Sequence, residues 1–118
     1  MISHELGRSG ERTAEIFLRK LGYSILEKGF RFLRGEIDII AREADCIVFV
    51  EVKTRSEEEF GFAEESIGQE KQKQIRKTAE GYLFLNSFQD RECRFDVISV
   101  ITDKNKDFLI RHFKNAFE

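Results

Sequence analysis

The sequence has no proline, no tryptophan, one methionine and two cysteines. The cysteines, Cys46 and Cys93, are too few for a disulfide framework, and their spacing does not match that of a zinc site. No apolar run approaches the roughly 20 residues that a membrane span needs. The first residues, MISHELGRSGER, lack the apolar middle section of a secretory signal. These absences favour a cytoplasmic protein over a secreted or membrane-embedded one.

The composition that remains is that of a single globular domain. The chain has 118 residues, and no repeat or linker divides it, so we expect one domain over residues 1–118. Twelve phenylalanines supply much of the bulk for a core. The net charge of −2 excludes general attraction to nucleic acid, although local lysines and arginines can still bind phosphate. An acidic stretch at 57–65 precedes a basic one at 71–77; both can equally be solvated surfaces.

Hydrophobic periodicity predicts the order helix, three strands, helix, then one or two strands. We expect the first helix from Ser9 or Gly10 to Gly22, with Ala14, Phe17, Leu18 and Leu21 on its apolar face. The other elements are expected at 23–27 with an extended continuation at 30–33, then 36–41, 46–54, 67–85, 95–101 and 107–113. This order predicts an α/β fold, with helices packed on a mixed sheet.

The strongest local signal is the hairpin formed by EIDIIA and CIVFVEVKT. If its turn is centred between Ala44 and Asp45, Asp38 lies opposite Glu51, with their Cβ atoms about 4.5–5.5 Å apart. Lys53 follows Glu51 by two residues and shares its face of the strand. The pattern therefore predicts that two carboxylates and a lysine lie together on an otherwise apolar hairpin.

Two adjacent carboxylates repel each other by about 1 kcal/mol in water and roughly 4 kcal/mol at an effective dielectric constant of 20. A divalent cation would neutralise both, and carboxylate oxygens suit Mg²⁺ or Mn²⁺. Such an ion polarises a phosphate oxygen and activates water, while Lys53 could orient that water or stabilise the transition state. The alternative is a surface ion pair between Glu51 and Lys53 on the solvated face of an edge hairpin.

Both helices carry further candidates. Glu11 borders the apolar face of the first helix and could be a third metal ligand, whereas Glu15 is expected further out. The alternative role of Glu11 is a favourable charge in the first helical turn. Lys71 is expected on the inward face of the second helix, to contact phosphate or the catalytic centre, and the alternative is simple solvation. Arg34 and Arg55 flank the acidic cluster and are further candidates for phosphate contacts. Asp96 is expected to form a structural ion pair with an arginine.

The motifs of the chain resemble those of the YraN family of small bacterial proteins. The resemblance runs from Gly10 to Val100 and rests on Gly10-Glu11, GEIDII, FVEVKTR, Phe60-Gly61, Lys71, the segment 79–82 and RFDV. The pairing of GEIDII with FVEVKTR is specific, whereas an isolated EVK would be weak. One departure is Gly29, because family members often carry Asn just before the aromatic residue and arginine that follow.

The resemblance implies a restriction-endonuclease-like fold, similar to that of Holliday-junction resolvases and other PD-(D/E)XK nucleases. Carried over by position, Asp38 and Glu51 become metal ligands, Lys53 the catalytic lysine and Glu11 the upstream acid. The implied activity is metal-dependent hydrolysis of phosphodiester bonds, with DNA favoured over RNA and branched or recombining DNA as a candidate substrate. A homodimer would suit a symmetric junction. The alternative is a non-catalytic module that keeps the nuclease fold and binds nucleic acid or a partner protein.

Overall fold

The computed structural model describes residues 4–56, 67–105 and 107–118. Its elements are, in order, α1 (His4–Lys20), β1 (Ser24–Phe32), β2 (Gly35–Glu43), β3 (Cys46–Ser56), α2 (Gln69–Leu85), β4 (Cys93–Thr102) and β5 (Phe108–Phe117). The predicted α/β order is confirmed, with two strands at the end. The acidic stretch at 57–65, which includes Phe60-Gly61, lies outside the described residues. No helix in the described ranges is long and apolar enough to cross a membrane.

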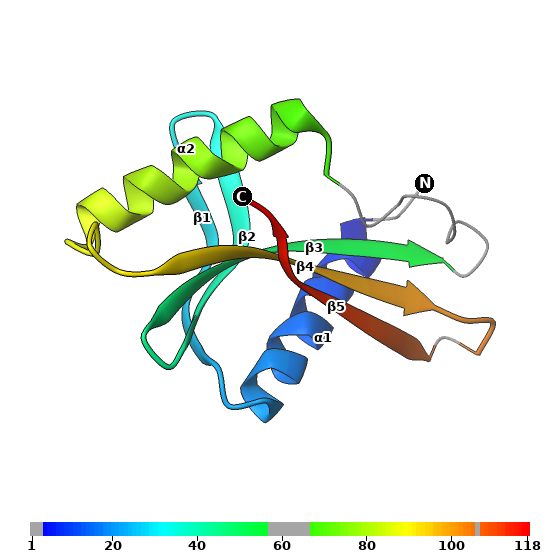
Figure 1. The fold of residues 1–118 in the computed structure, drawn as a ribbon. Coiled ribbons are helices and arrows are strands. Elements are labelled where there is room, and N and C mark those ends of the chain that lie inside the picture. Colours follow the sequence, from blue (N-terminus) through cyan, green and yellow to red (C-terminus); the bar gives the residue numbers. More distant parts are fainter. Residues whose placement is uncertain (1–3, 57–66, 106) are drawn as a thin grey trace.

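The five strands form one mixed sheet in which the spatial order follows the sequence, β1-β2-β3-β4-β5. Neighbouring strands are antiparallel except β3 and β4, which run parallel. A parallel pair needs a crossover connection, and α2 lies within it. Figure 1 shows α1 and α2 on opposite faces of the sheet. The hairpin β2–β3 is therefore interior to the sheet and not at its edge.

Two apolar clusters fill the spaces between the sheet and the helices. The cluster under α2 is built around Phe49, Ile75, Tyr82 and Phe95. The cluster under α1 joins Leu18 to the opposite face of the strands. Side chains alternate along a strand, so β3 contributes Phe49 to the α2 side and its even-numbered valines to the α1 side.

The first helix differs from its predicted boundaries at both ends. It begins at His4, before the expected Ser9 or Gly10, because the helix extends beyond the apolar stripe that marks it in the sequence. It ends at Lys20, and Leu21 is 53 % exposed instead of buried. The amides of Gly22 and Tyr23 donate to Arg19 and Leu18 carbonyls. Gly22 has a φ of 94°, so these contacts form a Schellman stop at the predicted glycine.

The strands are longer than their sequence signals. The two extended pieces predicted before Gly35 form the single strand β1, and β5 continues to Phe117 instead of ending near residue 113. The extra residues of β5 return to β4 after an irregularity, with Phe117 opposite Phe95. Their polar segment has no alternating pattern, which explains why the sequence did not reveal it.

Candidate active site

The candidate site lies where β2 separates from β3. Regular pairing runs from Glu43 opposite Cys46 to Ile39 opposite Val50, which confirms the predicted position of the turn. Towards Gly35, β2 remains paired with β1, while β3 remains paired with β4 through Glu51 and beyond. The sheet therefore splits beside Asp38 and Glu51.

Asp38 occupies this split. Its Oδ2 atom accepts a hydrogen bond of 2.8 Å from the amide of Val52, so the carboxylate serves as the partner that a buried backbone amide requires. Burial and the neighbouring charge of Glu51 raise the pKa of Asp38 to about 8, and Glu11 adds to this, although the Val52 amide acts in the opposite direction. A carboxyl group in this environment favours either a proton or a bound cation.

Glu51 lies beside Asp38 and is held by the second helix. Its side chain is 13 % exposed, and its Oε2 atom is 3.1 Å from Lys71 Nζ. Burial acts to lower the pKa of Lys71, but the charges of Glu51, Asp38 and Glu36 raise it above the ordinary value. Lys71 therefore reaches the acidic pair, as its place on the inward face of the helix predicted. Glu51 belongs to a central strand and is largely buried, which excludes the solvated edge-hairpin alternative.

Lys53 and Arg55 continue along β3 from Glu51. They lie opposite Ser99 and Ile101 of β4, and strand alternation places both on the same face as Glu51. Both side chains are half-buried. The predicted shared face therefore holds for Glu51 and Lys53, whereas Asp38 lies in the split and also lines a pocket on the α1 side.

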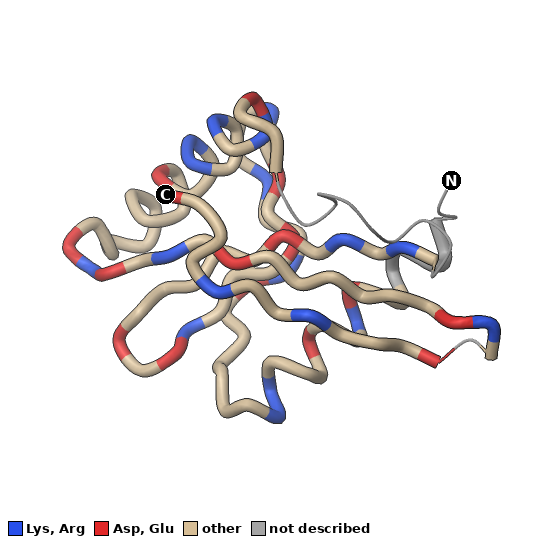
Figure 2. Tube along the Cα trace, turned by 45° about the vertical axis from the view of Figure 1, so that its right-hand side comes forward, with Lys and Arg blue, Asp and Glu red and all other residues tan. Residues whose placement is uncertain are grey.

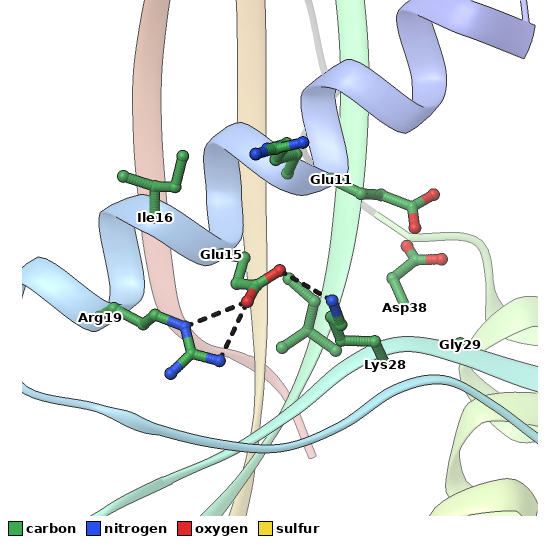
Figure 3. A pocket seen from close by; sticks show the side chains of 9 residues that line it. Glu11, Glu15, Ile16, Arg19, Lys28, Gly29 and Asp38 are labelled. Carbon is green, nitrogen blue, oxygen red and sulfur yellow. Dashed lines mark hydrogen bonds and ion pairs between the residues drawn. The ribbon is translucent and has the colours of Figure 1, made fainter.

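The first helix approaches the split through Gly10. A Cβ atom built on this buried residue would overlap the side chain of Thr54 on β3, so only glycine allows the helix to pack so closely. The next residue, Glu11, lines the same pocket as Asp38, and Figure 3 shows the two carboxyl groups turned towards each other. Close packing at Gly10 thus brings the predicted upstream acid to the site.

We expect Gly10→Ala to destabilise the protein by about 1–3 kcal/mol, because overpacking outweighs the better helix propensity of alanine. Urea unfolding monitored by circular dichroism measures the loss. Adding Thr54→Ala should restore part of the stability by removing the overlapping atoms. Gly68→Ala is the matched control, because nothing lies within 4 Å of a Cβ atom there. Equal stability of Gly10→Ala and the control would contradict this packing argument.

Glu15 and Arg34 lie elsewhere than their sequence positions suggested. Glu15 was expected to point outward, but its side chain is only 16 % exposed and lines the pocket with Asp38. The reason is that β1 runs beside α1 and brings Lys28 to Glu15. Arg34 is exposed in the turn between β1 and β2, where it lines a separate depression of about 440 Å³ with Leu33 and Lys77.

Across the described ranges, no group of three acidic, cysteine or histidine side chains is already assembled as a metal cluster. Glu51 is directed to Lys71, which offsets part of the acidic charge. Figure 2 shows positive and negative positions interspersed along the described chain. In the described part of the chain, the acids of the candidate site are therefore neighbours but not a formed metal cluster.

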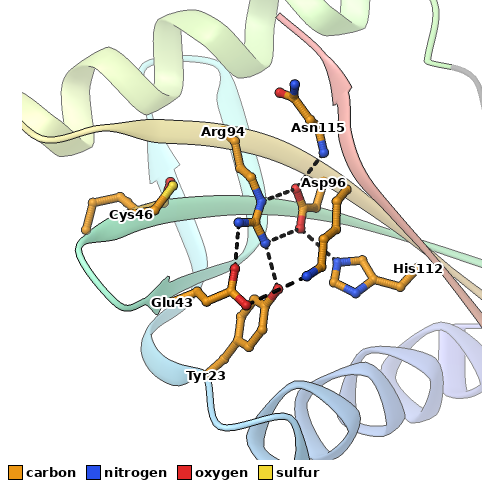
Figure 4. A network of polar contacts seen from close by, with 9 residues as sticks. Tyr23, Glu43, Cys46, Arg94, Asp96, His112 and Asn115 are labelled. Atoms are coloured by element: carbon orange, nitrogen blue, oxygen red, sulfur yellow. Dashed lines mark hydrogen bonds and ion pairs between the residues drawn. The ribbon is translucent and has the colours of Figure 1, made fainter.

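Reasoning from the sequence missed a second buried polar network, drawn in Figure 4. Asp96 is fully buried and contacts Arg94 at 3.0 Å and His112 at 2.8 Å, and it accepts the amide of Asn115 at 3.0 Å. Arg94 also contacts Glu43 at 2.7 Å. The predicted ion pair of Asp96 with an arginine is confirmed, but no sequence signal indicated His112 as its third partner. The network joins β4 to β5 and to the β2–β3 turn.

Comparison with known proteins agrees with the motifs. The family described as "Uncharacterised protein family UPF0102" matches residues 10–100. A UPF0102 protein of Chlorobium phaeobacteroides (strain BS1) is 43 % identical, with 98 % of this chain and 96 % of the relative covered. A UPF0102 protein of Caldicellulosiruptor saccharolyticus is 45 % identical, with 99 % and 100 % covered. The chain therefore belongs to the UPF0102 family, the YraN family that its motifs resemble.

Proposed function

We propose that this protein is a divalent-metal-dependent nuclease that hydrolyses phosphodiester bonds in DNA. The observation that carries the proposal is the pairing of Asp38 with Glu51 at the split between β2 and β3. The two carboxyl groups are partly buried, and the charge of Glu51 helps to raise the pKa of Asp38. Such a pair is poorly suited to stabilising a fold. It is well suited to binding a cation.

The donor set fits Mg²⁺ or Mn²⁺. Carboxylate oxygens from Asp38, Glu51 and Glu11 would hold the ion, and such hard oxygen donors favour these metals over zinc. When bound, the ion would polarise a phosphate oxygen, lower the pKa of a water molecule and neutralise the acids. The Val52 amide keeps one oxygen of Asp38 occupied, and so orients the other oxygen for a ligand.

The lysines have separate roles in this proposal. Lys53, on the face of Glu51, orients the attacking water or stabilises negative charge on the phosphorane-like transition state. Lys71, which pairs with Glu51, would contact a substrate phosphate. For Arg55, further along the same face of β3, we propose a contact with the phosphate backbone of the nucleic acid. Arg34 lies in a separate depression, so we propose for it a more distant phosphate.

The substrate class rests on family resemblance more than on the geometry of the site. We propose DNA ahead of RNA, with branched or recombining DNA as the first candidate and a homodimer as the matching assembly for a symmetric junction. The negative net charge implies that phosphate contacts are local and that binding depends on a few cations.

Cleavage of a labelled panel tests the proposal. A four-way junction, a flap, a single strand, a plain duplex and RNA are incubated with Mg²⁺ and then Mn²⁺. The proteins are the parent, Glu51→Gln, Lys53→Ala and, as the matched control, Lys73→Ala on the exposed side of α2. We expect metal-dependent cutting that falls at least about a hundredfold in the two site variants, because each removes stabilisation of the transition state. Lys73→Ala should retain it.

Titration calorimetry with Mn²⁺ separates the proposal from its alternative. We expect the parent to bind metal and Glu51→Gln to lose most of that binding. If the parent binds nucleic acid but neither binds metal nor cuts any substrate, the protein is a non-catalytic binding module and the nuclease proposal is wrong.

A further inference from the structure

The pocket beside α1 has a cationic wall that the proposed chemistry does not use. Its volume is about 640 Å³, within the range of small-ligand sites. Asp38 and Glu11 lie at one end in Figure 3. The remaining charged side chains that line it are Arg12, Glu15, Arg19 and Lys28.

Glu15 holds two of these cations in place. Its Oε2 atom is 3.0 Å from Arg19 Nη2, and its Oε1 atom is 3.3 Å from Lys28 Nζ. The arginine and lysine side chains are nevertheless 56 % and 62 % exposed. Exposed ion pairs contribute little to stability, so stability alone does not explain the arrangement. The arrangement holds Arg19 and Lys28 in fixed orientations, where both can contact a ligand in the pocket.

These cations lie next to the acids of the candidate site. Lys28 is directly opposite Ile39 in the sheet, and neighbouring strands are about 4.8 Å apart. Lys28 is therefore one strand spacing and one residue away from Asp38. Gly29, at φ 61°, faces the pocket beside Asp38. That left-handed conformation favours glycine or asparagine, and glycine adds no side chain to the space.

The charge of the pocket depends on the metal. Three acids and three cations line it, so an empty pocket has little net charge. A divalent cation held by Asp38 and Glu11 would make the same pocket attractive to an anion. Metal and an anionic ligand should therefore favour each other's binding.

We propose that this pocket binds the phosphate next to the scissile phosphate on the same nucleic-acid strand. Arg19 and Lys28 donate to that phosphate, and Glu15 is their positioning residue. The inference rests on the proposed nuclease function and specifies how the substrate strand continues from the cut, which is along α1.

A strand carrying one neutral linkage tests this assignment. The site of cutting is first mapped with Mn²⁺, and a methylphosphonate linkage is then placed at each position of a labelled single strand. Binding is measured by fluorescence anisotropy with Ca²⁺, so the readout does not depend on cleavage. The proteins are the parent, Arg19→Gln/Lys28→Gln, and Lys20→Gln, an exposed cation of α1 that does not line the pocket.

We expect the parent to bind roughly tenfold more weakly when the linkage beside the cut is neutral. The double variant should bind the natural strand about tenfold more weakly and lose nothing further from that neutral linkage. Its salt dependence of binding should also fall by about one unit of slope. Lys20→Gln should behave like the parent.

The inference is overturned if the double variant binds like the parent, or if it remains as sensitive to the neutral linkage. In either case, continued cutting leaves the nuclease proposal intact. If the parent binds the strand without cutting anything, the nuclease proposal fails, and the pocket assignment fails with it because the strand then has no scissile phosphate. If the parent binds neither this strand nor any nucleic acid of the cleavage panel, both are wrong.

Discussion

An Asp38→Asn protein is expected to lose at least about a hundredfold of its cleavage rate and yet, without metal, to be the more stable protein. In the parent, burial and the charge of Glu51 raise the pKa of Asp38 to about 8. Asparagine removes the charge and keeps an oxygen that can accept the Val52 amide. We expect a gain of roughly 1–3 kcal/mol in the free energy of unfolding above pH 8, the scale of an unfavourable buried polar group.

The direction of the pH dependence follows from that raised pKa. Between the ordinary carboxyl value and about 8, the folded parent holds a proton on Asp38 that the unfolded chain releases. The stability of the parent therefore falls as the pH rises through this window. The stability of Asp38→Asn should change less with pH over the same range. Saturating Mg²⁺ should raise the thermal midpoint of the parent and not that of the variant.

Thermal melts across the pH range, with Mg²⁺ and with EDTA, measure both effects. Asp45→Asn, at the exposed β2–β3 turn, controls for the loss of one negative charge. A variant that is less stable than the parent at every pH would show that Asp38 supports the fold and is not held there at a cost.

The largest loss of stability is expected from Asp96→Asn. The carboxylate is buried between Arg94 and His112, and asparagine removes its charge and one of the two acceptor oxygens that these donors share. Breaking such a buried network costs about 3–5 kcal/mol, which corresponds to a fall of roughly 10–20 °C in the thermal midpoint. Urea unfolding of the parent, Asp96→Asn and the exposed control Asp45→Asn measures it.

Acid sensitivity provides a second measurement on Asp96. Burial alone would raise the pKa of Asp96, but hydrogen bonds from His112, Arg94 and the Asn115 amide lower it below the ordinary value. The network therefore stabilises the protein above that ordinary value and is lost as the pH falls through the lowered pKa. Asp96→Asn should lack this acid transition. The role of the network would be contradicted if Asp96→Asn had the same thermal midpoint as the parent and lost stability in acid to the same extent.

The sequence predicted the fold and the proximity of Asp38 to Glu51 well because their signals are local. The hairpin containing Asp38 and Glu51 has strong strand residues on both sides of a short turn, and its register follows from the position of that turn. The inward place of Lys71 follows from helical spacing to Ile75. Both inferences use residues within one or two neighbouring elements.

What the sequence could not provide depends on contacts between distant elements. Glu15 looked solvent-facing because helical spacing does not reveal that β1 brings Lys28 beside it. His112 was missed because it meets Asp96 only after β5 pairs with β4. The position of Asp38 in a split, and not on the face of a flat hairpin, depends on β2 following β1 away from β3. The register of the β2–β3 pairing alone does not reveal that the two strands separate at this point.

The strand order also has a consequence for how the chain folds. β1, β2 and β3 are consecutive hairpin partners, so their pairing closes only short loops. The parallel pairing of β3 with β4 brings together distant segments and requires the long crossover through α2, a slower kind of closure. A meander that brings Asp38 and Glu51 together can therefore form early, while Lys71 joins them only once α2 has docked. During folding, Asp38 and Glu51 would then come together before Lys71 is there to offset their charge. Divalent ions in the refolding buffer would therefore bind the newly formed hairpin as well as the folded protein.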